Sequence, residues 1–197
     1  MPSPYTGKPS NSWSGITHQL IEKHPLQPKE LADVVLSSWD SIFLSRMGSN
    51  GFYIGKDIFP KPQIMGFLLH ELIPLELSAR YPNEWRGEQT ASDKDIVYIP
   101  DDSYSIEVKT SSNSNHIYGN RSYAQATTNG KKAKSGYYLA INFEKFTTSI
   151  LIPSIGLIRF GWLDSDDWIG QKAATGQQSR LPLEVEQNKL LDIYRKV

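Results

Sequence analysis

In the first half of the chain, apolar residues recur at the three- and four-residue spacing of an α-helix. Three segments have this pattern, and proline or glycine bounds each of them: residues 14–23, 28–47 and 62–80. Proline is favoured in the first turn of a helix, whereas inside a helix it removes a hydrogen bond and bends or breaks the chain. The pattern therefore predicts three helices, and Pro74 predicts a kink or a break within the third.

After Pro82 the pattern changes to short apolar and alternating runs, which are typical of β-strands. We expect strands over residues 95–99, 104–110, 136–143, 147–152 and 156–162, a weakly indicated short helix over 123–128 and a closing helix over 183–195. Helices followed by a run of strands predict an α/β or α+β fold, with a central mixed β-sheet flanked by helices.

Length and composition narrow the class of protein. The 197 residues are enough for a sizeable core, so we expect a single domain with a loosely held arm over the polar residues 1–13. This arm has no basic and apolar regions of the kind found in signal peptides, and no apolar run is long enough to span a membrane. The absence of cysteine excludes disulfides and thiolate zinc sites, so a reducing cytoplasm is the expected compartment.

The formal net charge is zero, with 21 basic and 21 acidic residues. A protein that binds nucleic acid through charge alone is basic, so this balance weighs mildly against such a partner. A nuclease is still compatible with it, because carboxylates that hold metal ions offset lysines elsewhere in the chain.

The strongest chemical signal lies on two neighbouring predicted strands. Asp95 begins one strand, and Glu107 and Lys109 share a face of the next. Mg²⁺ binds one or two carboxylates together with phosphate oxygens and waters, and phosphodiester hydrolysis needs such a hard cation. A nearby lysine can orient or deprotonate the attacking water and offset negative charge. The alternative is a solvated hairpin face, but the apolar neighbours Ile96 and Val108 favour core strands.

The third predicted helix offers a further carboxylate. At about 100° per residue, Glu71 falls in the middle of the apolar stripe that contains Phe67 and Leu75. A buried carboxylate is costly unless it is paired or bound to a metal ion. We therefore prefer Glu71 to Glu76, which falls at the margin of the stripe, where solvent exposure is the ordinary explanation.

Asp95 followed by Ile-Val, and then the string IEVKTSS from residue 106, resembles the PD-(D/E)XK nuclease signature as restriction endonucleases carry it. The strings LHELIPLE, SIEVKTSS, GNRSYAQ and RFGWLDSDDWIGQ are similar to the ScaI-like group of type II enzymes, and the resemblance covers nearly the whole chain. One departure is Lys94, which stands where the signature has proline. The resemblance implies a restriction-endonuclease-like core.

The same resemblance implies roles for individual residues. Asp95 and Glu107 are expected to bind Mg²⁺ with help from the Val108 carbonyl. Lys109 is expected to position the nucleophilic water, and Glu71 to hold the water network or a second ion. The products would carry 5′-phosphate and 3′-hydroxyl ends. The partner would be double-stranded DNA bound by a homodimer, because a two-fold protein matches a palindromic site.

A polar segment directly after the strand that carries Glu107 is the candidate for DNA contacts. Asparagine and arginine can read the edges of adenine and guanine, and lysines are suited to phosphate contacts. The candidates are Ser111, Ser112, Asn113, Asn115, His116, Asn120, Arg121, Lys131, Lys132 and Lys134. The alternatives are a flexible polar loop for the first group and a solvated turn for the lysines. Gln125 is either a neighbour of the active site or a polar residue on a helix face.

Two other functions compete with a restriction enzyme. One is a DNA repair or junction-processing nuclease of the same superfamily, which cleaves a different kind of DNA. The other is a DNA-binding or structural domain whose carboxylates are incidental. Cleavage of plain duplex DNA at one fixed sequence separates the first from a restriction enzyme, and Mg²⁺-dependent nicking of plasmid DNA excludes the second.

Overall fold

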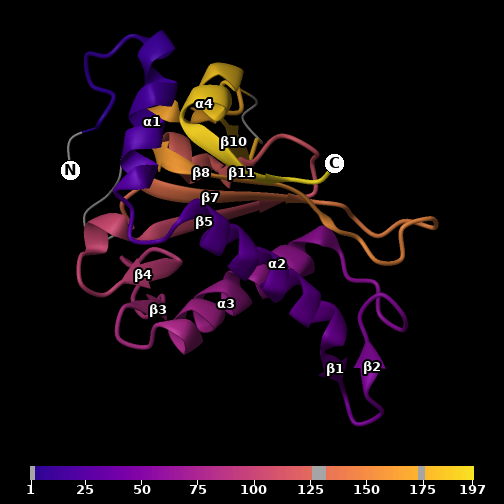
Figure 1. The fold of residues 1–197 in the computed structure, drawn as a ribbon. Helices are drawn as coiled ribbons and strands as arrows, with labels where there is room; N and C mark the ends of the chain where they lie inside the picture. The colour runs from indigo at the N-terminus through magenta and orange to yellow at the C-terminus, as the bar shows by residue number, and fades with distance from the viewer. Residues whose placement is uncertain (1–2, 126–131, 173–175) are drawn as a thin grey trace.

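The computed structural model describes residues 3–125, 132–172 and 176–197. Its centre is a six-stranded sheet in the order β11-β8-β7-β5-β4-β3 (Figure 1). These strands are β3 (Trp85–Gly87), β4 (Ile96–Tyr98), β5 (Ile106–Ser111), β7 (Gly136–Phe143), β8 (Ile155–Leu163) and β11 (Leu190–Arg195). β5 and β7 run parallel, whereas every other neighbouring pair in this sheet is antiparallel. The predicted mixed sheet is therefore confirmed.

Helices and a smaller sheet cover the two faces of the central sheet. The three helices predicted from the first half of the chain are confirmed as α1 (Trp13–Glu22), α2 (Pro28–Leu44) and α3 (Pro62–Arg80). α2 and α3 lie on one side of the sheet, and α4 (Leu183–Asn188) lies on the other (Figure 1). A three-stranded sheet of β6 (Tyr118–Asn120), β10 (Gln178–Arg180) and β9 (Ile169–Gly170) accompanies α4. No helix in the described segments has the length and apolar content to cross a membrane.

Four short 3₁₀ helices and one small hairpin complete the described elements. They are η1 (Ser10–Ser12), η2 (Asp102–Tyr104), η3 (Arg121–Ala124), η4 (Ser165–Asp167) and the hairpin of β1 (Arg46–Met47) and β2 (Phe52–Tyr53). η3 overlaps the start of the short helix predicted over 123–128, whose remaining residues from 126 on lie outside the described part of the chain.

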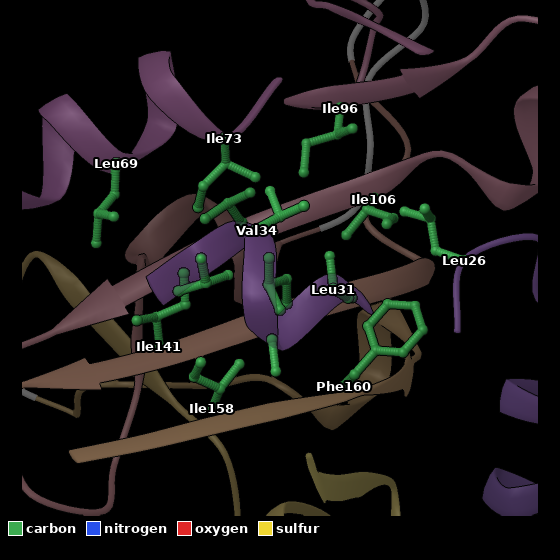
Figure 2. Close-up of a cluster of buried hydrophobic side chains, with 14 of the residues drawn as sticks. Leu26, Leu31, Val34, Leu69, Ile73, Ile96, Ile106, Ile141, Ile158 and Phe160 are labelled. Carbon is green, nitrogen blue, oxygen red and sulfur yellow. The ribbon is translucent and has the colours of Figure 1, made fainter. Parts of the chain in front are cut away.

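The main core lies between the central sheet and α2 and α3. Figure 2 shows Leu31 and Val34 of α2 and Leu69 and Ile73 of α3 among the side chains of the strands. The strand side chains labelled there are Ile96, Ile106, Ile141, Ile158 and Phe160, and all of them are fully buried. Burial of each such side chain contributes about 1.5–3 kcal/mol to folding. Ile106 points into this core. Because side chains alternate along a strand, Glu107 and Lys109 point to the other face of β5.

Pro74 does not break α3, which runs unbroken from Pro62 to Arg80. Pro74 is buried. A Cβ atom added at Gly87 of β3 would lie 3.5 Å from the Cβ atom of Pro74. The ring therefore packs against β3. Tertiary packing of this kind offsets the hydrogen bond that proline removes from a helix.

Two predicted elements are wrong. Residues 147–152 form no strand; the Thr147 hydroxyl accepts hydrogen bonds from the Ser149 and Ile150 backbones in a turn after β7. The predicted closing helix over 183–195 ends at Asn188 and is followed by β11. β11 pairs with β8 at the edge of the sheet, and a Cβ at Gly161 would lie 2.0 Å from the Lys189 carbonyl oxygen. Glycine at this position permits the approach, and pairing with β8 stabilises an extended strand where local periodicity favours helix.

The N-terminal segment packs against the rest of the molecule, where a loosely held arm is expected. Tyr5 is buried, and its hydroxyl shares a 2.9 Å hydrogen bond with the Thr17 hydroxyl of α1. The Ser3 hydroxyl donates to Asp164, 161 positions along the chain. A single buried aromatic residue thus anchors a stretch whose composition is that of a loop.

His24 lies between α1 and α2 among aromatic side chains. The ring centroids of Tyr137 and Phe160 are 4.6 and 4.8 Å from that of His24. Its Nδ1 accepts a hydrogen bond from the Leu26 backbone at 3.1 Å, which leaves Nε2 to donate to the Tyr104 carbonyl at 3.0 Å. This pattern is satisfied by neutral imidazole, and burial lowers the pKa of His24 to about 4.

We expect the pH dependence of stability to report this histidine. Its folded pKa of about 4 lies below the unfolded value of 6.5, so stability is full above pH 6.5 and falls as the pH drops toward 4. The difference corresponds to about 3 kcal/mol. In urea denaturation, His24→Gln should lose much less unfolding free energy over this range than the parent. The exposed His18 provides the control, because His18→Gln should keep the parental pH dependence. Equal pH dependence in His24→Gln and the parent would contradict the assignment.

Candidate active site

The candidate site lies where β4 and β5 separate. These strands pair only at Ile96 and Ile106, and beyond that point no backbone partner of β4 reaches β5. The Val108 backbone N–H donates instead to the Asp95 side chain, with a distance of 2.7 Å to Oδ2. The hydrogen bond holds the Asp95 side chain against β5, beside Glu107.

α3 passes close to the same strand. A Cβ added at Gly66 would lie 2.5 Å from the Thr110 hydroxyl, so only glycine allows this approach. One turn further on, His70 Nδ1 lies 3.7 Å from Asp95 Oδ2. Burial lowers the pKa of His70, although the neighbouring Asp95 carboxylate acts in the opposite direction.

Glu107 is the centre of the cluster and is only 2% exposed. Its Oε1 accepts a hydrogen bond from Lys109 Nζ at 2.7 Å and another from the Tyr123 hydroxyl. Lys109 Nζ also donates to the Val108 carbonyl at 3.1 Å and lies 4.7 Å from the centroid of the Tyr123 ring. Asp95, Glu107 and Lys109 therefore converge, as the sequence predicts.

Lys132 bridges the two carboxylates. Its Nζ lies 2.7 Å from Asp95 Oδ1 and 3.2 Å from Glu107 Oε2, and 3.3 Å from Glu88 Oε2. From the sequence, Lys132 is expected to contact phosphate, with a solvated turn as the alternative. The structure instead places its ammonium group inside the cluster, in the position that a cation shared by Asp95 and Glu107 would take.

The charges of the cluster shift the pKa values of its members. Burial disfavours the ionised form of Glu107, but Lys109 and Lys132 outweigh it and lower the pKa of Glu107 to about 2. Burial also disfavours the charged form of Lys109, but Glu107 and Asp95 raise its pKa above the usual value. Lys132 follows the same rule, with its pKa raised by Glu107 and Asp95 against burial. Glu107 and the two ammonium groups thus stabilise one another in their charged forms.

Lys94 stands outside this balance. It is buried, donates to the Ala133 carbonyl at 3.0 Å and lies 5.4 Å from the centroid of the Tyr138 ring. Burial lowers its pKa to about 8, and the positive charges of Lys109 and Lys132 act in the same direction. Lys94 is therefore a third buried lysine near Asp95 and Glu107, but among the described residues it forms no ion pair with either carboxylate.

The donor set suits a hard cation. Glu107 Oε2 is buried and, within the described part of the chain, accepts no hydrogen bond, although Lys132 lies near it. Asp95 Oδ1 and the Val108 carbonyl face the same cluster through Lys132 and Lys109. Mg²⁺ needs only one or two protein carboxylates and completes its shell with water and phosphate. No group of three or more His, Cys, Asp or Glu side chains in the described segments forms a metal site by itself.

Glu71 does not lie in the buried stripe of α3. The buried face of α3 contains Met65, Leu69, Ile73 and Leu77, whereas Phe67 and Leu75, which flank Glu71 in the predicted stripe, are exposed. The premise of a buried carboxylate is therefore wrong. Glu71 is exposed and lines a groove beside His70. Glu76 forms an ion pair with Arg80 on the helix surface.

A groove of about 780 Å³ runs from α3 past the end of β5 to the small sheet. Four predicted DNA contacts line it: Ser111, Ser112, Asn113 and Asn120. Tyr118 and Gln178 line the same groove and were not predicted. On the other wall, His70 connects the groove to Asp95.

The other predicted contacts are held elsewhere. Asn115 and His116 line a separate hollow near α4, where His116 Nδ1 lies 2.7 Å from Glu186 Oε2. Arg121 donates to the Gly176 carbonyl at 3.1 Å. Lys134 donates to the Ser122 and Gln125 carbonyls, which leaves it less suited to a phosphate contact. Lys131 lies outside the described residues.

Three neighbours of the carboxylates were not predicted from the sequence: His70, Tyr123 and Lys94. For Lys94, the unpredicted feature is its burial. Tyr123 falls in the string GNRSYAQ, which supports the family resemblance but assigns no role to the residue. His70 directly precedes Glu71 on α3, so a correct choice of the buried face would have directed attention to it.

A mixed sheet flanked by helices, with carboxylates and a lysine gathered where two strands separate, defines a nuclease with a restriction-endonuclease-like fold. The chain belongs to the ScaI restriction endonuclease family, whose model matches residues 3–194. It is 53% identical over 194 residues to the type II restriction enzyme ScaI of Streptomyces caespitosus. The aligned residues cover 98% of this chain and 85% of that protein. No solved structure matches the chain significantly.

The charge balance of the cluster predicts unequal effects of two substitutions on stability. Glu107→Gln leaves the buried ammonium group of Lys109 without its carboxylate partner, and breaking a buried ion pair in this way should cost about 3–5 kcal/mol. Lys109→Met leaves Glu107 paired with Lys132, so its cost in the free energy of unfolding should be clearly smaller. Urea denaturation at neutral pH measures both.

Glu76→Gln in the exposed pair with Arg80 is the control and should cost no more than about 1 kcal/mol. A Lys109→Met variant that is destabilised as much as Glu107→Gln would show that Lys132 does not compensate for the loss of Lys109 at this site.

Proposed function

We propose that this chain is a type II restriction endonuclease that hydrolyses phosphodiester bonds of double-stranded DNA at a short palindromic sequence, with Mg²⁺, and leaves 5′-phosphate ends. The observation that carries the proposal is the convergence of Asp95, Glu107 and Lys109 beside a groove. Family membership supports the nuclease class, and the donor set supports the metal.

Asp95 Oδ1, Glu107 Oε2 and the Val108 carbonyl would hold Mg²⁺. When bound, the ion would offset the negative charge that develops on the phosphate and activate a water molecule. Lys132 would have to leave its place between the carboxylates, since two cations cannot share it. A DNA phosphate close to the site would then be its natural partner, which restores the predicted contact in the complex.

Lys109 would orient the attacking water. Its ammonium group donates to Glu107 and to the Val108 carbonyl and lies over the Tyr123 ring, so its position is set by three neighbours. Fixed donors aimed at the reacting group lower the barrier without reorganisation during the reaction. Glu71, at the edge of the groove, would hold water or a second ion near the phosphate.

DNA would lie in the groove lined by Ser111, Ser112, Asn113 and Asn120. These short polar side chains can donate to phosphate oxygens or contact base edges. Asn115, His116, Arg121 and Lys134 contribute less to this surface, because they contact protein groups outside the groove.

A homodimer is the expected assembly on a palindromic site. The segment after β2 contacts the loop after β7, where Gly55 lies beside the Leu151 carbonyl and Phe59 packs on Phe146. Exposed apolar residues flank these contacts along the chain: Leu44, Phe59, Leu151 and Ile152. Leu44 is 76% and Ile152 72% exposed, which is unusual for residues of this size grouped together. We propose that a second copy of the chain covers this patch.

Sedimentation analysis tests the dimer. The parent should sediment as a dimer at micromolar concentration, and Ile152→Lys should shift it to monomer by placing a charge in the contact. Leu183→Lys, on an exposed side chain of α4, should leave the dimer intact. A monomeric parent, with or without duplex DNA, would rule out the proposed assembly.

Cleavage of plasmid DNA tests the catalytic assignment. Asp95→Ala and Lys109→Ala should each lower the rate by at least about 10²–10³-fold, since each removes a group that acts on the transition state. Chelation of Mg²⁺ by EDTA should abolish cutting by the parent. Asp33→Ala and Lys29→Ala, which break an exposed ion pair on α2, are the matched controls and should cut at the parental rate.

Two results would count against the proposal. Undiminished cutting by Asp95→Ala and Lys109→Ala would overturn the site. Ends that map to many sequences, or to branched DNA alone, would indicate a repair or junction-processing nuclease instead of a restriction enzyme.

A further inference from the structure

The three-stranded sheet β6-β10-β9 has one buried face and one exposed face. On the buried side, a Cβ at Gly119 would lie 3.1 Å from Tyr123 and Trp168 and 2.9 Å from the Ser179 hydroxyl. Because side chains alternate along a strand, the residues on either side of Gly119 and Ser179 point the other way. The exposed face therefore carries four side chains of β6 and β10, here called the outer face: Tyr118, Asn120, Gln178 and Arg180. The exposed Ile169 of β9 lies beside Arg180 on the same side of the sheet.

The strand register groups these side chains in pairs. Gln178 lies opposite Asn120, and Arg180 lies opposite Tyr118. Residues directly opposite in antiparallel strands have Cβ atoms about 4.5–5.5 Å apart. Two amides and one guanidinium group thus lie on one face of the antiparallel strands β6 and β10.

The polar groups of the outer face have no protein partner. Within the described part of the chain, the side chains of Asn120, Gln178 and Arg180 make no hydrogen bond or ion pair. Each offers paired donors or acceptors: Asn and Gln can bond adenine N6 and N7 together, and Arg can bond guanine O6 and N7. Polar surface side chains without partners are common, but here two amides and one guanidinium group share one face of a sheet.

The charge near the outer face suits DNA. The hollow beside β10 is lined by Tyr118, Gln178, Arg180 and Lys172, and no described residue that lines it is acidic. This contrasts with the catalytic end of the groove, where Glu71 and Glu88 are exposed.

The outer face is continuous with the proposed DNA groove. Tyr118, Asn120 and Gln178 form one end of the groove of about 780 Å³ whose opposite wall includes His70, the neighbour of Asp95. A duplex whose backbone reaches the carboxylates therefore passes the outer face. The major groove of B-DNA admits a two-stranded β-ribbon.

We propose that β6 and β10 read the recognition sequence through the outer face, with Asn120 and Gln178 contacting adenine and Arg180 contacting guanine in the major groove. The proposal rests on the proposed function, since it assigns the specificity of the same nuclease. It implies a recognition sequence that contains both adenine and guanine.

Binding measurements without cleavage test the proposal. Digestion of a DNA of known sequence first identifies the duplex that the parent cuts. Fluorescence anisotropy with Ca²⁺ in place of Mg²⁺ then measures affinity for that duplex and for a scrambled duplex of the same composition. Gln178→Ala and Arg180→Ala should each lose at least about 10-fold in affinity for the cut sequence, with unchanged affinity for the scrambled duplex. The slope of log affinity against log salt should stay parental.

Further variants make the result specific. Gln178→Glu keeps the size of the side chain but removes its donors, so it should lose affinity for the cut sequence like Gln178→Ala. Gln187→Ala and Arg195→Ala, exposed residues beside the separate hollow at α4 and β11, should behave as the parent. Thermal melting confirms that all variants are folded.

The failure of this inference is distinct from failure of the proposed function. If the parent cuts no defined sequence, the proposed function fails. If the parent cuts one sequence and the outer-face variants discriminate between the duplexes as it does, only the inference is overturned. Equal losses on both duplexes with a shallower salt slope would also overturn it, because they would make Arg180 a phosphate contact.

Discussion

The ion pairs of Glu107 are the interaction on which the candidate site depends. A carboxylate that is 2% exposed is stable only because Lys109 and Lys132 lie at 2.7 and 3.2 Å from its two oxygens. Lys132 extends the same interaction to Asp95. Lys109 and Lys132 together supply the positive charge that the two carboxylates require, and these contacts hold the site in its geometry.

The fold presents this cluster because one strand serves both the core and the site. Ile106 and Val108 of β5 are buried against α2 and α3, so alternation turns Glu107 and Lys109 to the opposite face. The separation of β4 from β5 frees the Val108 N–H, which Asp95 accepts. The small sheet on that opposite face then extends the groove away from the carboxylates. Catalysis and recognition would thus share one side of the central sheet.

Sequence periodicity predicted what depends on local pattern. Asp95, Glu107 and Lys109 could be found because strand alternation places side chains two residues apart on one face. Lys132 and His70 could not, since their approach depends on how distant segments pack. On α3, the stripe of residues 64, 67, 68 and 75 and the stripe of residues 65, 69, 73 and 77 are both apolar enough to be buried. Packing against the neighbouring strands and α2 selects the second. Pairing with β8 similarly made β11 a strand, where residues 190–195 read equally well as helix.

The most direct test of the central claim is the position of a bound metal ion. Crystals of the protein soaked in Mn²⁺, measured at a wavelength where manganese scatters anomalously, should show a peak between Asp95 and Glu107, with the Lys132 ammonium group displaced from its position between them. A peak elsewhere, or an undisturbed Lys132 bridge at saturating Mn²⁺, would contradict the account.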